Sequence, residues 1–262
     1  MNKLLIDNNL KGYSVLDIFT KKNVNNFEKK ILEKINIKIS ESTHLRKELK
    51  NLKYFHKIPF SKKEKSKIFE PKDRFIKLNT QILRRIKKNK FINKILYEQW
   101  GHNKYKIMWV ASLEKQEIKN NVCGFRICEP YKKGVGTHID LHIGGKIMRE
   151  LNSLISIWVP LRGFSKKYTL KFSPGSHLFD HPTNQFQIKK NIISNVFKKG
   201  YAKKFSFHRP NLKLGQGIIF NSNLLHGNSD NLGTLSRVSV EIRLYNSKKL
   251  KNWLPKNKKL KI

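Results

Sequence analysis

The chain has 262 residues, enough for one large domain or two small ones with a sizeable buried core. Its 56 lysines and arginines outnumber 18 aspartates and glutamates, and the formal net charge of +38 favours an anionic partner such as nucleic acid, an anionic membrane surface or an acidic small molecule. Lysine dominates the basic residues, whereas dedicated nucleic-acid proteins rely more on arginine, so compositional drift explains the charge more simply.

The cysteines and the apolar stretches exclude two further classes of protein. Cys123 and Cys128 are too few for a disulfide framework or a four-cysteine zinc site. Met1 to Thr20 lacks the apolar run of a signal peptide, and the longest apolar stretch, Leu154 to Leu161, is too short to cross a bilayer. We therefore expect a cytoplasmic protein without a membrane span, and the sequence favours no particular oligomeric state.

Residues 1–100 have a helical pattern. Apolar residues recur every three to five positions from Phe19 to Ile35, which is typical of an amphipathic helix. Further helices are predicted over Leu45 to Phe55 and over Arg74 to Ile86, and Lys88 to Leu96 continues the second one. This region is expected to pack on the core that follows it.

After Gly101 the pattern changes to short runs rich in β-branched and aromatic residues. Turn residues separate the runs, which indicates an antiparallel barrel or jelly roll over residues 101–247. We expect a helical insertion over about 184–199 and a solvated basic tail over 248–262. The predicted strands are Tyr105 to Ser112, Val122 to Cys128, Leu154 to Val159, Tyr168 to Phe172, Gly217 to Phe220 and Leu235 to Tyr245.

Three residues have the character of a metal site. His138 and Asp140 are two positions apart, so in an extended strand both side chains point to one face. His226, far downstream, is the candidate third ligand. Two imidazoles and one carboxylate suit non-haem Fe(II) with open positions for oxygen chemistry. The His-x-Asp pattern alone is a weak signal, because a chain with nine histidines produces it easily by chance.

Arg237 stands eleven residues after His226 in a strand of clean alternation. Arg237, Ser239, Glu241 and Arg243 share one face, which turns either to water or to a polar barrel interior. An arginine with a hydroxyl two residues further on can hold a carboxylate with paired hydrogen bonds, which a lysine does poorly. Arg237, helped by Ser239, is therefore a candidate anchor for the distal carboxylate of 2-oxoglutarate.

Several motifs follow one another over roughly Cys123 to Asn246: His138-x-Asp140, Ser156-Ile-Trp-Val-Pro-Leu161, Pro174-Gly-Ser-His177, His226-Gly-Asn228 and Arg237. Together they resemble the phytanoyl-CoA dioxygenase family. The resemblance implies a double-stranded β-helix, the jelly roll of the cupin type, mainly β with flanking helices and an N-terminal helical region. It also implies Fe(II) held by His138, Asp140 and His226, with O2 and 2-oxoglutarate as co-substrates. Asn228 stands where relatives often have serine and is a further 2-oxoglutarate contact.

The expected activity is hydroxylation of a polar or anionic small molecule, such as a sugar-like compound or an intermediate of secondary metabolism. Candidate substrate contacts are Arg126, His142, Trp158 and Arg243. Halogenating relatives lack the carboxylate ligand, so Asp140 favours hydroxylation. Two alternatives stay open: an oxygenase that acts on nucleic acid, and a basic binding protein that has lost catalysis.

Overall fold

The structure is a computed structural model. It describes residues 9–42, 48–58, 61, 74–112, 117–133, 136–140, 154–182, 186–189, 192–227 and 230–249. His142, Asn228 and residues 250–262 of the predicted basic tail lie outside them.

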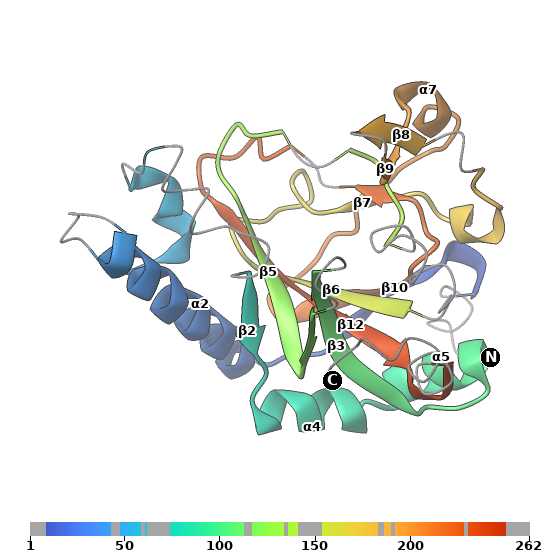
Figure 1. The fold of residues 1–262 in the computed structure, drawn as a ribbon, viewed down its shortest axis with the longest axis horizontal. Helices are drawn as coiled ribbons and strands as arrows, with labels where there is room; N and C mark the ends of the chain where they lie inside the picture. The colour runs from blue at the N-terminus through green and yellow to red at the C-terminus, as the bar shows by residue number, and fades with distance from the viewer. Residues whose placement is uncertain are drawn as a thin grey trace.

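An eight-stranded antiparallel sheet forms the centre of the molecule (Figure 1). Its order is β1-β10-β6-β12-β3-β4, with β5 also paired to β12 and β2 paired to β5. The central strand β12 thus has β6 along one edge and both β5 and β3 along the other. The strands are β1 Tyr13–Asp17, β2 Phe75–Lys77, β3 Tyr105–Ser112, β4 Glu117–Asn120, β5 Val122–Cys128, β6 Leu154–Arg162, β10 Gln216–Asn221 and β12 Arg237–Asn246.

A second, smaller layer contains β7 Lys171–Phe172, β8 Phe186–Lys189, β9 Ile192–Phe197 and β11 His226–Gly227. β11 pairs with β7, and β8 pairs with β9. His138 joins these two pairs, because its backbone bridges to His226 in β11 on one side and to Val196 in β9 on the other. The ring of Phe172 in β7 meets that of Phe220 in β10 at 5.2 Å, so the two layers face each other as in a jelly roll.

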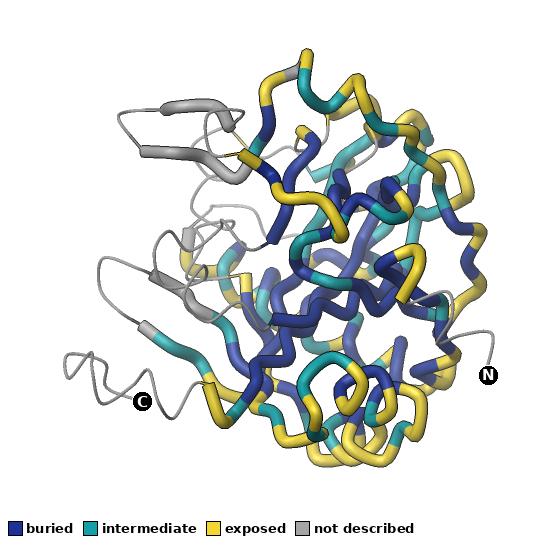
Figure 2. The backbone as a smooth tube through the Cα atoms, turned by 90° about the vertical axis from the view of Figure 1, so that its right-hand side faces the viewer, coloured by how far each residue is buried: buried dark blue, intermediate teal, exposed yellow. Residues whose placement is uncertain are grey.

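The other face of the large sheet is covered by helices. These are α2 Lys21–Ser42, α4 Thr80–Lys88 and α5 Lys90–Trp100, with a short 3-10 helix η1 Leu52–Lys57. The apolar face of α2 and the apolar side chains of β12 belong to one buried core. Figure 2 shows the buried strands in the centre and exposed backbone on the outer sides of the helices. The mainly β fold with an N-terminal helix is therefore confirmed. No described helix is long and apolar enough to cross a membrane.

Residues before Gly101 differ from the purely helical pattern expected. β1 and β2 belong to the large sheet, and the predicted helix over Arg74 to Ile86 is a strand followed by a helix that begins at Thr80. Asn89 ends α4 and its side chain accepts a hydrogen bond from the Ile92 backbone N–H, so α5 is a separate helix. Within Leu45 to Phe55, the described helix is the 3-10 turn that begins at Leu52.

The expected helical insertion over 184–199 is wrong. The described residues there form the β8–β9 pair, and only the four-residue helix α7 Lys199–Ala202 follows. β-branched residues at Ile192, Ile193 and Val196 favour strand over helix, and they outweigh the surrounding lysines and asparagines. Of the predicted strands, β3 and β5 have the expected bounds, β6 is longer and β7 is shorter.

Candidate metal centre

His138 and His226 are paired through their backbones. The His138 N–H donates to the His226 carbonyl at 2.8 Å, and the His226 N–H donates to the His138 carbonyl at 2.9 Å. Asp140, two residues on, donates its backbone N–H to the Ser222 carbonyl at 2.9 Å. This pairing brings the downstream histidine, 88 residues away in sequence, beside the His-x-Asp segment.

The three side chains converge in a buried group. One ligand atom from each of His138, Asp140 and His226 lies within 4.8 Å of the other two, and each residue is less than 5% exposed. Among the residues that the structure describes, this is the one group of three such side chains that could hold a metal ion. The geometry therefore brings together the residues expected as metal ligands.

Both imidazoles present the correct nitrogen. His138 Nδ1 lies 2.8 Å from the Gly136 carbonyl oxygen, and His226 Nδ1 lies 2.9 Å from the Leu224 carbonyl oxygen. A carbonyl can only accept, so each Nδ1 carries a proton, and in a neutral imidazole of this tautomer Nε2 is the nitrogen with the free lone pair. Metal-binding histidines commonly have this arrangement, because the outer hydrogen bond fixes the tautomer and the ring orientation.

Asp140 is held from outside the cluster as well. The Ser156 hydroxyl donates to Asp140 Oδ2 at 2.6 Å, which leaves Oδ1 3.7 Å from His226 Nε2. Burial would raise the pKa of Asp140, but Arg243 and the two histidines outweigh burial and lower it. Burial and the neighbouring His226 lower the pKa of His138. An ionised carboxylate and neutral imidazoles are the states that bind a metal.

Aromatic packing immobilises His226. Its ring lies 6.0 Å from the Phe172 ring in a stacked arrangement and 4.8 Å from the Phe220 ring. The His138 and His226 rings are 4.2 Å apart. Such apolar surroundings exclude water and strengthen electrostatic interactions within the site.

Arg237 begins β12 and is 4% exposed. It donates to the Tyr168 carbonyl oxygen. Burial lowers the pKa of Arg237, and the nearby Arg209 and Arg126 act in the same direction. Three guanidinium groups, opposed in part by the carboxylate of Asp230, therefore create a positive potential at this end of β12, where an anionic group would be stabilised.

The polar face of β12 turns to the interior. Ser239 is 5% exposed and lies opposite Arg126 of β5, while Glu241 and Arg243 are also buried. Val238, Val240, Ile242 and Leu244, on the other face of the strand, pack in the core that the helices cover. The polar face of β12 therefore turns to a polar barrel interior and not to water.

Two of the expected substrate contacts have other surroundings. Trp158 is buried in an apolar cluster with residues such as Phe220, and Arg243 contacts Asp140 and Glu241. Neither presents a free surface, because packing in one case and ion pairing in the other occupy the side chain. Arg126 remains half-buried beside Ser239. Sequence analysis missed Ser156, although a serine within the apolar run of β6 is a signal that could have identified it.

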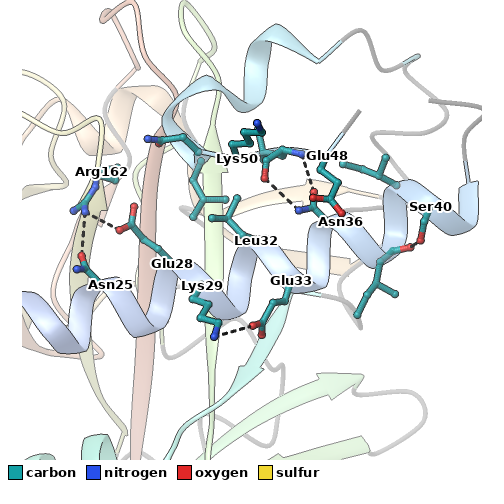
Figure 3. Close-up of a pocket in the computed structure, with 15 residues that line it drawn as sticks. Asn25, Glu28, Lys29, Leu32, Glu33, Asn36, Ser40, Glu48, Lys50 and Arg162 are labelled. Carbon is teal, nitrogen blue, oxygen red and sulfur yellow. Dashed lines mark hydrogen bonds and ion pairs between the residues drawn. The ribbon is translucent and has the colours of Figure 1, made fainter. Parts of the chain in front are cut away.

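A groove of about 890 Å³ lies away from the metal centre, between α2 and residues 48–52 (Figure 3). Its polar lining is internally paired. Arg162 contacts Glu28 at 2.7 Å, and the Asn36 side chain both donates to and accepts from the Leu49 backbone. These contacts stabilise the position of α2, and we assign the groove no catalytic role.

Comparison with solved structures identifies the fold as that of non-haem oxygenases. The carbocyclase SnoK from nogalamycin biosynthesis, a non-haem α-ketoglutarate-dependent enzyme, is 11% identical, with a TM-score of 0.55 over 94% of this chain and 84% of that chain. EctD from S. alaskensis, in a structure with 2-oxoglutarate and 5-hydroxyectoine, is 14% identical, with a TM-score of 0.54 over 95% and 77%.

The epimerase SnoN, in complex with Fe3+, α-ketoglutarate and nogalamycin RO, is 12% identical, with a TM-score of 0.53 over 93% of this chain and 82% of that chain. Sequence comparison finds neither a matching family model nor a matching curated protein. At these identities the likeness establishes the double-stranded β-helix, and the chemistry has to be argued from the site itself.

Proposed function

We propose that the protein is a non-haem Fe(II) oxygenase that uses 2-oxoglutarate and O2 to hydroxylate a small molecule. The observation that carries the proposal is the buried group of His138, Asp140 and His226, with both Nδ1 atoms already engaged by backbone carbonyls. Two imidazoles and one carboxylate on one side of a metal leave three positions open, which suits Fe(II) and oxygen chemistry. When bound, the iron would supply the activation of O2, coupled to conversion of 2-oxoglutarate to succinate and CO2.

The protein's own groups supply ligation and orientation. His138 Nε2, His226 Nε2 and Asp140 Oδ1 would hold the metal, and Ser156 fixes the carboxylate. Phe172 and Phe220 keep the His226 ring in place and exclude water. This rigidity favours the proposal, because a productive site must hold its groups in one geometry before the reactants bind.

Arg237 would bind the distal carboxylate of 2-oxoglutarate, with Ser239 and Asn228 as further donors. Burial of a guanidinium beside Arg209 and Arg126 is costly, and a bound dianion offsets that cost. A charge-assisted contact of this kind also gives orientation, since the guanidinium fork and a carboxylate match in geometry.

The substrate in this proposal is a polar or anionic small molecule. Arg126 is the described candidate contact, and His142 is a second candidate. SnoK and SnoN are named for nogalamycin, and the EctD structure contains 5-hydroxyectoine. These names support an intermediate of secondary metabolism and give no support to nucleic acid. Asp140 would take the metal position that a halide would need, so hydroxylation is proposed.

We further propose that the chain is a divergent relative of the phytanoyl-CoA dioxygenase family, on the shared motifs around His138, Trp158, Pro174 and Arg237. In this organisation residues 101–247 form most of the oxygenase core, residues 1–100 pack on it and add β1 and β2 to its sheet, and 248–262 form a basic tail. The relatives found by structure are oxygenases and related enzymes of the same general class.

An anaerobic titration tests the proposal. Adding Fe(II) and 2-oxoglutarate to the protein should produce the weak visible charge-transfer band of the chelate, and succinate release can then be screened across candidate small molecules. Asp140→Ala should give neither signal, while Asp17→Ala, an exposed aspartate of β1, should behave as wild type. A wild-type protein without the band would contradict the proposal and favour a non-catalytic binding protein.

A further inference from the structure

Arg243 lies beside the metal centre with its side chain almost fully buried. Its Nε donates to Glu241 Oε1 at 2.7 Å, and its Cζ lies 3.9 Å from the centroid of the Trp109 ring on β3. These two contacts, together with a hydrogen bond to the Tyr245 side chain, fix the plane of the guanidinium. Among the described residues Nη2 has no hydrogen-bond partner, and it lies buried 3.5 Å from Asp140 Oδ1.

The two carboxylate oxygens of Asp140 have different surroundings. Oδ2 accepts the short hydrogen bond from Ser156, whereas Oδ1 faces both His226 Nε2 and Arg243 Nη2. A carboxylate oxygen has two lone-pair directions. Oδ1 can therefore bind a metal on the His226 side while the positive charge of Arg243 lies 3.5 Å away on its other side.

We propose that Arg243 is a positioning residue that, together with Ser156, restricts Asp140 to binding the metal through Oδ1 alone. This inference rests on the proposed function. The way Asp140 binds decides how many coordination positions stay open on the metal. Three remain when the carboxylate binds through one oxygen, two for 2-oxoglutarate and one for O2. A carboxylate free to turn and bind through both oxygens would occupy one of those three positions.

Glu241 balances the charge of Arg243. A lone guanidinium so close to a divalent cation would repel it strongly in a buried site. The carboxylate of Glu241, in direct contact with Arg243, offsets that charge. The pair therefore places a guanidinium N–H group 3.5 Å from Asp140 Oδ1 with little net charge. Its loss should affect the binding of 2-oxoglutarate more than the binding of the metal.

A purely structural pair would behave differently. Its loss would lower stability and reduce the metal and 2-oxoglutarate affinities in parallel, since both depend on the same fold. Loss of the positioning role instead separates the two affinities. The separation is measurable by anaerobic calorimetry, first with the metal alone and then with 2-oxoglutarate on the metal-loaded protein.

The test uses the double variant Arg243→Met with Glu241→Gln, because removing the arginine alone would leave a buried glutamate unpaired. The matched control is Arg162→Met with Glu28→Gln, which removes another arginine–glutamate contact of 2.7 Å, six residues along β6 from Ser156. Arg243→Lys is a second test variant that keeps the positive charge beside Glu241 but loses the planar guanidinium group with its several N–H donors.

Both test variants should bind Mn(II) within about threefold of wild type, and their affinity for 2-oxoglutarate should fall about tenfold or more. The control should leave both affinities unchanged. Equal losses of the two affinities, or unchanged 2-oxoglutarate affinity, would overturn the inference while the proposed function stands. A wild-type protein that binds no metal would contradict the proposed function itself, and this inference with it.

Discussion

The hydroxyl of Ser156 lies 2.6 Å from Asp140 Oδ2, so a residue of the large sheet directly supports a candidate metal ligand from another segment. Outer hydrogen bonds of this kind typically contribute 10- to 100-fold to metal affinity. Ser156→Ala should therefore weaken Fe(II) or Mn(II) binding about tenfold while the protein stays folded. Ser236→Ala, which removes a buried hydroxyl bonded to His56, should not change metal affinity. Equal losses in the two variants would rule out a specific role for Ser156.

Replacing Arg237 tests the assignment of the 2-oxoglutarate site. Arg237→Gln removes the charge but keeps a hydrogen-bonding group, and the loss of a buried charge-assisted contact typically costs 2 kcal/mol or more. We expect the dissociation constant of 2-oxoglutarate to rise about 30-fold or more, with metal affinity unchanged. Calorimetry on the anaerobic, metal-loaded protein measures both. Unchanged 2-oxoglutarate binding would show that another residue anchors the co-substrate.

Burial of His181 predicts a pH dependence of stability. Its Nε2 donates to the Ser176 carbonyl at 2.9 Å, and its Nδ1 lies 2.9 Å from the Tyr201 hydroxyl. Burial lowers the pKa of His181 below its unfolded value of about 6.5. The unfolded chain therefore takes up a proton that the folded one resists. The stabilisation is fully present above about pH 6.5 and is lost as the pH falls below that value.

Urea denaturation at pH 7.5, 6.5 and 5.5 checks this sign. His181→Gln should be less stable than wild type at pH 7.5, and the gap between them should shrink by up to about 1 kcal/mol at pH 5.5. Burial also lowers the pKa values of His177 and His208, so these histidines contribute to the pH dependence of stability as well. They are present in both proteins, and the difference between wild type and variant therefore reports His181. A gap that stays constant with pH would contradict a neutral, buried His181.

Two glycines with positive φ allow the cost of backbone strain to be measured separately from the cost of steric crowding. Gly163 has a φ of 64°, and a Cβ added there would collide with the Ser236 carbonyl oxygen, directly before Arg237. Gly101 has a φ of 70° and has open space around it. Gly101→Ala should cost about 1 kcal/mol of unfolding free energy, and Gly163→Ala should cost more, about 2–4 kcal/mol. Thermal or urea unfolding measures the difference, and equal costs would contradict the packing described.

Local patterns were sufficient for part of the fold. β3 and β5 have the bounds that their β-branched and aromatic residues predict, and the amphipathic spacing from Phe19 to Ile35 correctly indicates α2. The i, i+2 spacing of His138 and Asp140 predicted a shared face, and both residues do belong to the cluster, although neither lies in a named strand. The bounds of these elements and the His138–Asp140 pair depend on nearby residues, which a sequence shows directly.

Non-local pairing accounts for the rest. Tyr13 of β1 lies opposite Phe220 of β10, and no local pattern in the first residues indicates a partner so far along the chain. In the same way, the alternation of β12 left open whether Arg243 faces water. Its contact with Asp140 exists only once residues 136–140 pack against the large sheet. Ser156 became recognisable as a partner of Asp140 for the same reason.

The most direct test is a crystal structure of the protein grown anaerobically with Fe(II) and 2-oxoglutarate, with anomalous data collected at the iron edge. We predict one iron peak at about 2.0–2.2 Å from His138 Nε2, His226 Nε2 and Asp140 Oδ1, with 2-oxoglutarate chelating the iron and extending towards Arg237. An iron peak elsewhere, or none at these three side chains, would contradict the proposed metal centre.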